Sequence, residues 1–427
     1  MKNRSPRARH AHVLLLGLFV ATAAHAADPR ESLTLARAIE LATSRSPSVA
    51  TFGAETEAAT QRNEADALPP NLVLESEFEN FAGTGQTSGG QALEATVRVA
   101  RVFELGDKAA LRRGVGTAEI ESLAADQRTR QLDLTAEVAR RFIHVLSDQE
   151  MLTTAERATK LAKQARDAAQ QRVTIGASSP AAVGRAEISL ARAEIEQEHA
   201  EHELASSRVK LAVLWGEQTP SFAAVDGNLF ELSSTESFDA YRTRLDSSPD
   251  LSRFASKLLA EDARVRLAQA QRKPDISVSA GVRRLESFDD QALVAGFSIP
   301  LGTRQRADYQ ERAARASRTV IESEREARRL ELHAILFDLY QELIHARTEA
   351  QSLRERVRPQ AEAMLKITSD GYQAGRFSLL ELVDAQIQLI ELEREAIRAA
   401  AQFHTLMVDI KRVTGDPITG LATRSAP

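Results

Sequence analysis

The sequence contains no cysteine, one tryptophan, 13 prolines and 20 glycines among 427 residues. The absence of cysteine excludes disulfide bonds, thiol chemistry and a lipid-modified cysteine at a mature N-terminus. The formal net charge of −5 is small, so composition does not support nucleic-acid binding. The few glycines and prolines cluster, and the stretches between them are rich in Ala, Glu, Arg, Leu and Gln. Such a composition is typical of long helices rather than compact α/β domains.

The N-terminus has the pattern of a secretory signal peptide. Four basic residues precede an apolar run over residues 11–24, and the triplet Ala24-His25-Ala26 matches an A-x-A cleavage site. This run is too short to span a bilayer, which requires roughly 20 apolar residues. We therefore expect residues 1–26 to be a signal peptide. Because no later stretch is apolar enough for a membrane helix, we expect the mature protein to be periplasmic, secreted or a membrane β-barrel.

The same order of patterns occurs twice along the chain. A short helical segment ends in Ser-Pro at residues 46–47 and again at 248–249, and each is followed by a polar helix that stops before a further proline. Two turn glycines, Gly176 and Gly375, are 199 residues apart, and so are the glycines 40 residues later, Gly216 and Gly415. An offset that persists along a whole segment indicates an internal duplication. The expected parts are a first repeat over residues 27–227, a second over 228–417, and a disordered tail over 418–427.

Between these helices the hydrophobic period changes to two. In residues 71–101, and again in residues 274–300, apolar and polar residues alternate in two runs joined by a polar loop. This pattern predicts two β-hairpins, each with one apolar and one polar face. The charged residues that we expect on the polar face, lining a water-filled barrel lumen, are Glu75, Glu77, Glu79, Arg98 and Arg283.

Very long helical stretches follow both hairpins. Residues 108–172 contain no proline, and residues 305–357 contain neither proline nor glycine. At ~1.5 Å per residue, a helix of about 65 residues is on the order of 100 Å long. The apolar spacing is amphipathic and too polar for lipid, so it predicts a coiled coil. Each long helix ends in a glycine-bearing turn and is followed by a shorter return helix.

Four strands cannot close a barrel by themselves. The smallest membrane barrels have about eight strands, and an open sheet edge is not tolerated in hydrocarbon. Three copies would supply twelve strands, with the long helices forming a tube below them. The predicted fold class is mainly α with a small β part. It comprises duplicated coiled-coil helical hairpins that form an α-barrel, and four strands per subunit of a trimeric, twelve-stranded transmembrane β-barrel. The alternative from another class is a periplasmic coiled-coil scaffold without a pore.

Three segments carry a resemblance to a known family: residues 33–47, residues 102–108 and residues 273–301. They resemble the N-terminal helix, the exit from the first hairpin and the second hairpin of the TolC-like outer-membrane efflux proteins. The resemblance extends from about residue 33 to residue 417. The second-hairpin segment is the most specific, and it is similar to the CzcC-like branch that serves heavy-metal pumps of the resistance–nodulation–division (RND) class.

The resemblance implies an outer-membrane homotrimer, embedded in lipid, that docks with a periplasmic adaptor (membrane fusion) protein and an inner-membrane RND pump. It implies passive conduction of substrate, expected to be divalent heavy-metal cations, without enzymatic activity or a cofactor. An exit duct for type I protein secretion or drug efflux on the same fold is the alternative. No nucleophile elbow, phosphate loop or zinc-protease motif occurs in the sequence.

The second helical turn contains the candidate entrance residues. Glu381 and Asp384 are three residues apart and therefore share a helix face, so a trimer would form two rings of carboxylates that attract cations. From spacing alone, two ordinary exposed acids are the simpler interpretation. The resemblance implies that both line the periplasmic entrance constriction and that Tyr372 helps to hold it shut. The first turn, residues 176–182, lacks the acidic partner that the family often has, which leaves such a link by Tyr372 in doubt.

His199 and His202 are the weak candidates for metal ligands. Their i, i+3 spacing permits two imidazoles to share an ion. A solvated helix face is the more frequent explanation of such a pair, and a tight site would obstruct a conduit. We therefore expect no resident metal.

Overall fold

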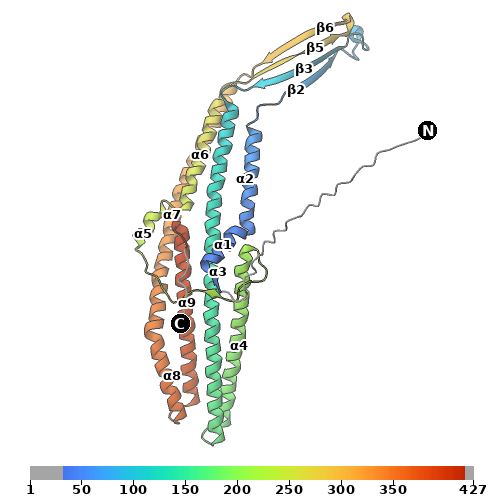
Figure 1. The fold of residues 1–427 in the computed structure, drawn as a ribbon. Helices are drawn as coiled ribbons and strands as arrows, with labels where there is room; N and C mark the ends of the chain where they lie inside the picture. The colour runs from blue at the N-terminus through green and yellow to red at the C-terminus, as the bar shows by residue number, and fades with distance from the viewer. Residues whose placement is uncertain (1–31, 419–427) are drawn as a thin grey trace, which may run out of the picture.

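The computed structural model describes residues 32–418, so the expected signal peptide and all but the first residue of the expected tail lie outside the described part. Long helices form a narrow bundle with a β-sheet at one end and two helical tips at the other (Figure 1). The first half consists of β1 (Leu33–Thr34), α1 (Leu35–Arg45), α2 (Pro47–Asp66), β2 (Val73–Glu79), β3 (Glu94–Phe103), α3 (Lys108–Thr174), α4 (Pro180–Ala212) and β4 (Val225–Asp226).

The second half repeats the order of the helices and the hairpin, without counterparts of β1 and β4 among its described elements and with one interruption. Its elements are α5 (Phe238–Leu245), α6 (Pro249–Ala270), β5 (Ile276–Leu285), β6 (Asp290–Ser298), α7 (Thr303–Ser352), η4 (Leu353–Val357), α8 (Arg358–Gln373) and α9 (Leu379–Thr414). The long helix of the first half, α3, is continuous over 67 residues. Its counterpart is divided into α7 and α8 by η4, a π-helical turn that precedes Pro359.

The two hairpins join into one four-stranded antiparallel sheet with the order β2-β3-β5-β6. The central pairing between β3 and β5 extends over ten residue pairs, from Glu94↔Leu285 to Phe103↔Ile276. The predicted fold class, duplicated helical hairpins with four strands per chain, is confirmed. The β3–β5 pairing was not part of the prediction, because alternation within each hairpin does not specify which hairpin edges meet.

Both halves end their return helices in the same way. Gly216 and Gly415 adopt left-handed conformations with φ of 86° and 80°. A Cβ at Gly216 would lie 4.0 Å from Pro47 Cγ, and one at Gly415 would lie 2.6 Å from Pro249 Cδ. These prolines are the first residues of α2 and α6. Each return helix therefore ends against the first turn of the helix that leads to its own repeat's hairpin.

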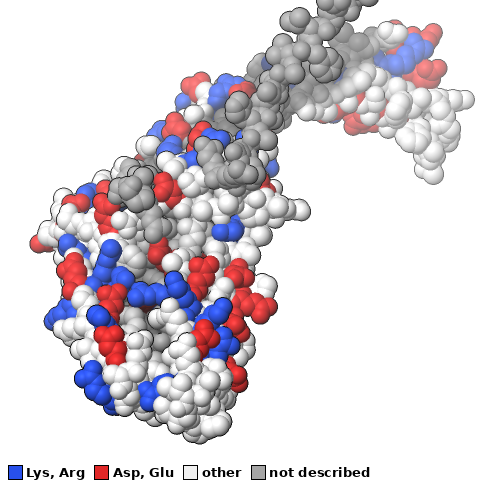
Figure 2. All heavy atoms as spheres, turned by 60° about the horizontal axis from the view of Figure 1, so that its bottom comes forward, with Lys and Arg blue, Asp and Glu red and all other residues white. Residues whose placement is uncertain are grey.

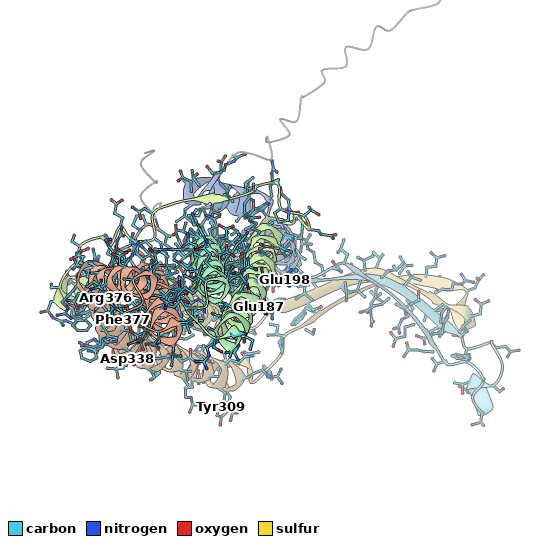
Figure 3. The ribbon with its side chains drawn as sticks, turned by 90° about the horizontal axis from the view of Figure 1, so that it is seen from below. Glu187, Glu198, Tyr309, Asp338, Arg376 and Phe377 are labelled. Carbon is cyan, nitrogen blue, oxygen red and sulfur yellow. The ribbon has the colours of Figure 1, made fainter. Side chains whose placement is uncertain are left out.

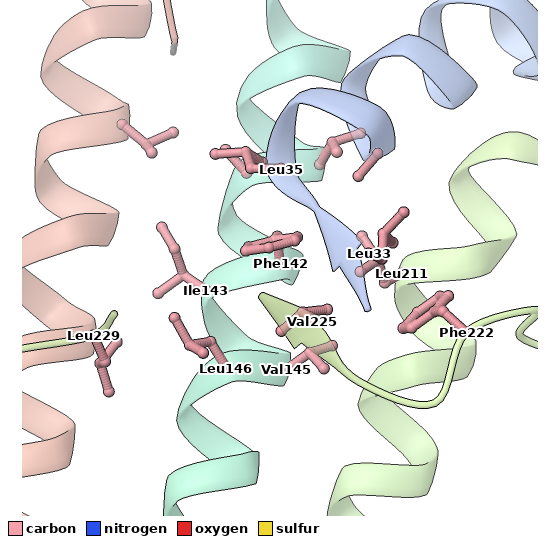
Figure 4. Packing of buried hydrophobic residues seen from close by; sticks show 14 of the residues in the cluster. Leu33, Leu35, Phe142, Ile143, Val145, Leu146, Leu211, Phe222, Val225 and Leu229 are labelled. Carbon is pink, nitrogen blue, oxygen red and sulfur yellow. The ribbon is translucent and has the colours of Figure 1, made fainter. Parts of the chain in front are cut away.

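The main core lies midway along the bundle, where β1, β4 and α1 pack against α3 and α4 (Figure 4). Phe142 and Leu211 are fully buried there. A second core joins α5, α7 and α9 around Phe403 and Leu336. Within residues 32–418, no helix is both long enough and apolar enough to cross a membrane. Basic and acidic side chains are interspersed over the helical part (Figure 2), in agreement with the solvated helix faces that the sequence indicates.

Candidate functional sites on the sheet and at the helical tips

The register of the sheet places all five predicted lumen residues on one face. Glu75 pairs with Arg98, Glu77 with Thr96 and Glu79 with Glu94, and Thr96 pairs in turn with Arg283. Since side chains alternate along a strand, these residues project to the same side. We call this side the polar face.

Two arginines connect the carboxylates of the polar face. Arg98 lies 2.5 Å from Glu75 and 3.3 Å from Glu77, measured between nitrogen and carboxylate oxygen. Arg283 lies 3.2 Å from Glu79 and 2.8 Å from Glu94, and its Nε donates to the Thr96 hydroxyl at 2.9 Å. Four glutamates share two arginines, so this group carries a net negative charge. Glu94 is the member that the sequence analysis did not select.

The opposite side, here the apolar face, exposes large hydrophobic side chains. Leu74 is 71% exposed, Leu293 88% and Phe297 79%. A contiguous apolar surface of this kind indicates a partner or a membrane rather than water. Phe103 and Phe297 lie toward the helical end of the sheet, and Phe78 lies toward the loops. The other exposed members of this face are Leu72, Val97, Val99, Val278, Val282 and Ile299.

A buried lysine anchors the sheet to the helices. Lys108, the first residue of α3, is 7% exposed. Its ammonium group lies 2.6 Å from Asp275 Oδ1 and donates to the Lys273 carbonyl at 2.8 Å. The Leu105 N–H donates to the same carboxylate oxygen at 3.2 Å. The basic residue that opens the long helix therefore ties the exit of the first hairpin to the entry of the second.

At the end of the bundle opposite the sheet, Glu381 stabilises the first turn of α9. Ser378 is the N-cap of α9, and the Glu381 carboxylate accepts hydrogen bonds from the Ser378 N–H at 2.7 Å and its hydroxyl at 2.8 Å. The Glu381 N–H donates in return to the Ser378 hydroxyl oxygen at 3.3 Å, and this reciprocal arrangement is a capping box. The hydrogen bond from the backbone N–H, together with that from the hydroxyl, lowers the pKa of Glu381. Asp384 is exposed one turn later and accepts a hydrogen bond from Gln388 Nε2 at 2.9 Å.

Tyr372 is buried, at 3% exposure, in a cluster formed by both helical hairpins. The guanidinium of Arg172, near the end of α3, lies 4.9 Å from the Tyr372 ring centroid and donates to the Tyr372 carbonyl. It also donates to the Ala177 carbonyl at 3.4 Å. Burial raises the pKa of the Tyr372 phenol, and the nearby Arg172 charge opposes that shift. The first turn lacks the acidic partner that the family often has, and Tyr372 is instead linked to the first hairpin through the cation Arg172.

Viewed along the helices, the two hairpins lie side by side, with Arg376 and Phe377 at the tip of α8–α9 and Glu187 and Glu198 on α4 (Figure 3). His199 and His202 are exposed on α4, and His202 Nε2 lies 3.7 Å from Glu198 Oε1. Within residues 32–418, no group of three or more His, Asp or Glu side chains is arranged to hold a metal ion.

Comparison with known proteins decides the family. The sequence profile of the family described as "Outer membrane efflux protein" matches residues 38–217 and 240–416, one segment in each half. This chain belongs to the outer membrane efflux protein family. It is therefore an outer-membrane channel whose helical part forms a tunnel in the periplasm. Members of this family are efflux channels, which are not enzymes.

Individual relatives agree with this assignment. The chain is 28% identical over 400 residues to the cobalt-zinc-cadmium resistance protein CzcC of Cupriavidus metallidurans, covering 91% of this chain and 92% of that protein. It is 26% identical over 247 residues to the nickel-cobalt-cadmium resistance protein NccC of Alcaligenes xylosoxydans xylosoxydans, covering 57% and 56%. The crystal structure of the outer membrane protein VceC from Vibrio cholerae has the same fold. Its TM-score is 0.67 at 20% identity, over 89% of this chain and 96% of that one. The predicted resemblance to the CzcC-like branch is confirmed.

Proposed function

We propose that this chain is the outer-membrane subunit of a tripartite efflux system. It works as a homotrimer and passively conducts divalent heavy-metal cations from a periplasmic adaptor and an inner-membrane RND pump to the exterior. The names of CzcC and NccC, which refer to cobalt, zinc, cadmium and nickel resistance, support the cargo class. Energy comes from the pump, and the channel itself performs no chemical step.

One observation carries this proposal: the sheet has two open edges and two chemically opposite faces. Strands β2 and β6 each have a single neighbour. An open edge is unstable in hydrocarbon, so β6 of one subunit pairs with β2 of the next until twelve strands close. Strands of seven to ten residues approach the 9–11 residues of a tilted transmembrane strand. The apolar face then contacts lipid, and its phenylalanines near both ends correspond to the aromatic girdles of such barrels.

Helices α4 and α7 also expose apolar residues that fit a contact with a second copy of this chain. On α4, Ile188 and Ile195 are 60% and 64% exposed and seven residues apart. On α7, Leu330, Phe337 and Ile344 are exposed with the same spacing of seven. Apolar residues repeated every seven positions form the seam of a coiled coil. His202 lies in the α4 seam, seven residues beyond Ile195, which favours a packing position over a metal site.

The charges along the conduit suit cations. The polar face becomes the barrel lumen, where four glutamates and two arginines per subunit leave a net negative surface. At the periplasmic end, Asp384 forms a ring of three carboxylates in the trimer. Glu381 adds to this field, although its capping box holds the side chain against Ser378. Tyr372, held by the cation–π contact and the hydrogen bond from Arg172, keeps the entrance closed.

Two measurements test the proposal. Purified full-length protein should form trimers that conduct ions in planar bilayers, whereas a coiled-coil scaffold without a pore should give no conductance. A deletion strain should become sensitive to at least one of cobalt, zinc, cadmium, copper and nickel. If it tolerates all five metals like its parent and becomes sensitive to organic drugs or fails to secrete a polypeptide, the metal assignment is wrong.

A further inference from the structure

The four strands of the sheet contain four arginines, and three of them pair with acidic side chains of the same hairpins. Arg98 and Arg283 pair with glutamates on the polar face. Arg284, on the apolar face near the loops, pairs with Asp289. The fourth, Arg101, is exposed on the apolar face, and within residues 32–418 its guanidinium forms neither an ion pair nor a hydrogen bond. Arg101 is thus a charge on the lipid side of the sheet without an acidic partner.

Arg101 lies close to the end of β3 that joins the helices (Figure 1). Its neighbours in the same row of the apolar face are Val278 on β5 and Phe297 on β6. It is four residues from Val97, which lies near the middle of the sheet. At ~3.4 Å per residue and a strand tilt of about 40°, its Cα lies roughly 10 Å from the middle of an apolar band about 25 Å tall. The backbone of Arg101 is therefore close to the periplasmic edge of that band.

The side chain of Arg101 points toward the same edge. Its guanidinium carbon lies 5.3 Å from the ring centroid of Phe103, which is two residues nearer to the helices on the same face. Arginine extends its apolar stem along hydrophobic surface in this way and keeps its charged group in a polar layer. The contact with the ring stabilises the cation but supplies no acceptor for its N–H groups. A guanidinium with free donors therefore lies at the level of the lipid headgroups.

Other exposed cations lie where the sheet meets the helices. Lys273 precedes β5, and Arg304 and Arg306 belong to the first turn of α7. Two carboxylates at this end are already neutralised, because Glu104 and Asp275 each lie 2.6 Å from a basic residue of α3. The exposed charge around the periplasmic end of the sheet is therefore positive, which favours an anionic partner.

We propose that Arg101 and Phe103 form a site on the outer surface of the barrel that binds the phosphate group of a phospholipid in the periplasmic leaflet of the outer membrane. This inference rests on the proposed function, because the apolar face must contact lipid. The planar guanidinium donates two N–H groups to two phosphate oxygens, and the Phe103 ring holds it in place. A net-anionic headgroup such as phosphatidylglycerol binds most strongly, since a zwitterionic headgroup carries a cation that offsets its phosphate. Each trimer has three such sites.

The test measures which lipid lies beside Arg101 in full-length trimers reconstituted into vesicles. Phe297→Trp places a fluorescent reporter in the same row of the apolar face, whereas the native Trp215 is 3% exposed in the main core of the bundle. Brominated phosphatidylglycerol and brominated phosphatidylcholine quench the reporter when they lie next to it, so the two degrees of quenching give the relative binding. We expect about a fivefold preference for phosphatidylglycerol, the usual effect of one basic residue near an anionic surface. Added salt should weaken this preference.

Arg101→Gln should abolish the preference. Arg284→Gln is the matched control and should leave it unchanged, because that arginine of the apolar face is paired with Asp289 at the other end of the sheet. If Arg101→Gln does not assemble, Arg101→Lys replaces it. This variant keeps the charge but loses the two-pronged donation, so only part of the preference should remain. A preference that is the same in these variants as in the protein with Arg101 would overturn the site.

The same reporter separates a failure of this inference from a failure of the proposed function. If neither brominated lipid quenches Phe297→Trp, the apolar face does not contact lipid and the trimeric barrel is wrong. If both lipids quench it equally while Arg101 is present, the barrel stands and the phosphate site is wrong. If inorganic phosphate removes the preference at constant ionic strength, the site binds free anions, which would overturn the assignment to a lipid headgroup.

Discussion

The guanidinium of Arg172 stacks on the ring of Tyr372 and donates a hydrogen bond to the carbonyl of the same residue. The two residues come from different repeats and lie at the ends of α3 and α8. Gly375 lies in the turn after α8 with φ of 75°, and a Cβ there would lie 3.6 Å from Arg172 Nη2, so the guanidinium packs against this turn at van der Waals distance. One side chain of the first hairpin therefore holds the tip of the second.

Replacing Arg172 by alanine should open the entrance. A cation–π contact and a charge-assisted hydrogen bond together contribute about 2 kcal/mol per subunit, or roughly a thirtyfold change in the closed-to-open ratio of each subunit. Single-channel recording should show a higher open fraction at an unchanged full conductance. Arg166→Ala is the control, since the Arg166 guanidinium pairs with the adjacent Asp167 on its own helix. An Arg172→Ala channel that stays as closed as the control would contradict the link.

A substitution by lysine should destabilise the barrel on the apolar face of the sheet and be tolerated on the polar face. Val282 is 46% exposed on the apolar face and pairs with Val97 near the middle of the sheet. Val282→Lys places a charge in lipid and should destabilise the barrel by about 2–4 kcal/mol. Ser279→Lys lies on the polar face of the same strand and should be tolerated. The resistance of the assembled trimer to urea measures the stability of both variants. Equal loss in the two variants would show that the apolar face does not contact lipid.

The polar face should contribute to ion selectivity. Changing Glu75, Glu77 and Glu79 together to glutamine removes three carboxylates per subunit and leaves Arg98 and Arg283 in excess. The ratio of cation to anion permeability, obtained from reversal potentials in a salt gradient, should fall and should fall most at low ionic strength, where screening is weakest. Arg98→Gln should shift the ratio in the opposite direction. No shift in either variant would place the selectivity elsewhere, for example at Asp384.

His404 should make the folded protein sensitive to mild acid. It is 6% exposed, and its Nε2 lies 2.9 Å from the Leu229 carbonyl, so the ring donates there as the neutral tautomer. Burial lowers the pKa of His404 to about 4 from its ordinary value of 6.5, against the raising effect of the Leu229 hydrogen bond. The unfolded chain therefore binds a proton that the folded chain does not between these values, and stability falls as pH drops from about 6.5 to about 4.

The loss amounts to about 3 kcal/mol at most and changes no further below pH 4, where both states are protonated. Thermal melting of the trimer at pH 7 and at pH 4.5 measures it. His404→Gln should remove much of this difference, whereas His345→Gln should keep it, since the His345 side chain is 77% exposed. A wild-type melting temperature that is the same at both pH values would refute the prediction.

The helices and strands could be predicted from the hydrophobic periodicity of the sequence. The strands were predicted from alternation, and they run in the structure as Val73–Glu79, Glu94–Phe103, Ile276–Leu285 and Asp290–Ser298. The second long helix was predicted to run to its glycine-bearing turn at Gly375, and in the structure a π-turn at Leu353–Val357 interrupts it before α8 reaches that turn. A proline in a single sequence signals an interruption, but it does not say whether the helix ends there or continues beyond it.

The ion pairs could not be predicted from hydrophobic periodicity. Arg157 and Arg172 are two of many arginines interleaved with acids along helices, a pattern that most often marks solvated faces. Lys108 lies in the segment 102–108 that carries the family resemblance, yet its partner Asp275 is 167 residues away in the chain. Glu381 was selected for the entrance, and its capping box with Ser378 lies within one turn but competes with that role.

The duplication, the amphipathic strands and the long helices could be predicted from the sequence alone, because each shows as a regular spacing along the chain: two residues in the strands, about 3.5 in the helices and 199 between the repeats. The folded structure was needed to show that β3 pairs with β5, that Arg172 reaches Tyr372, and that Glu393 of α9 lies between Arg157 and Arg358. Those contacts join residues far apart in the chain, and their geometry depends on how the two repeats pack against each other.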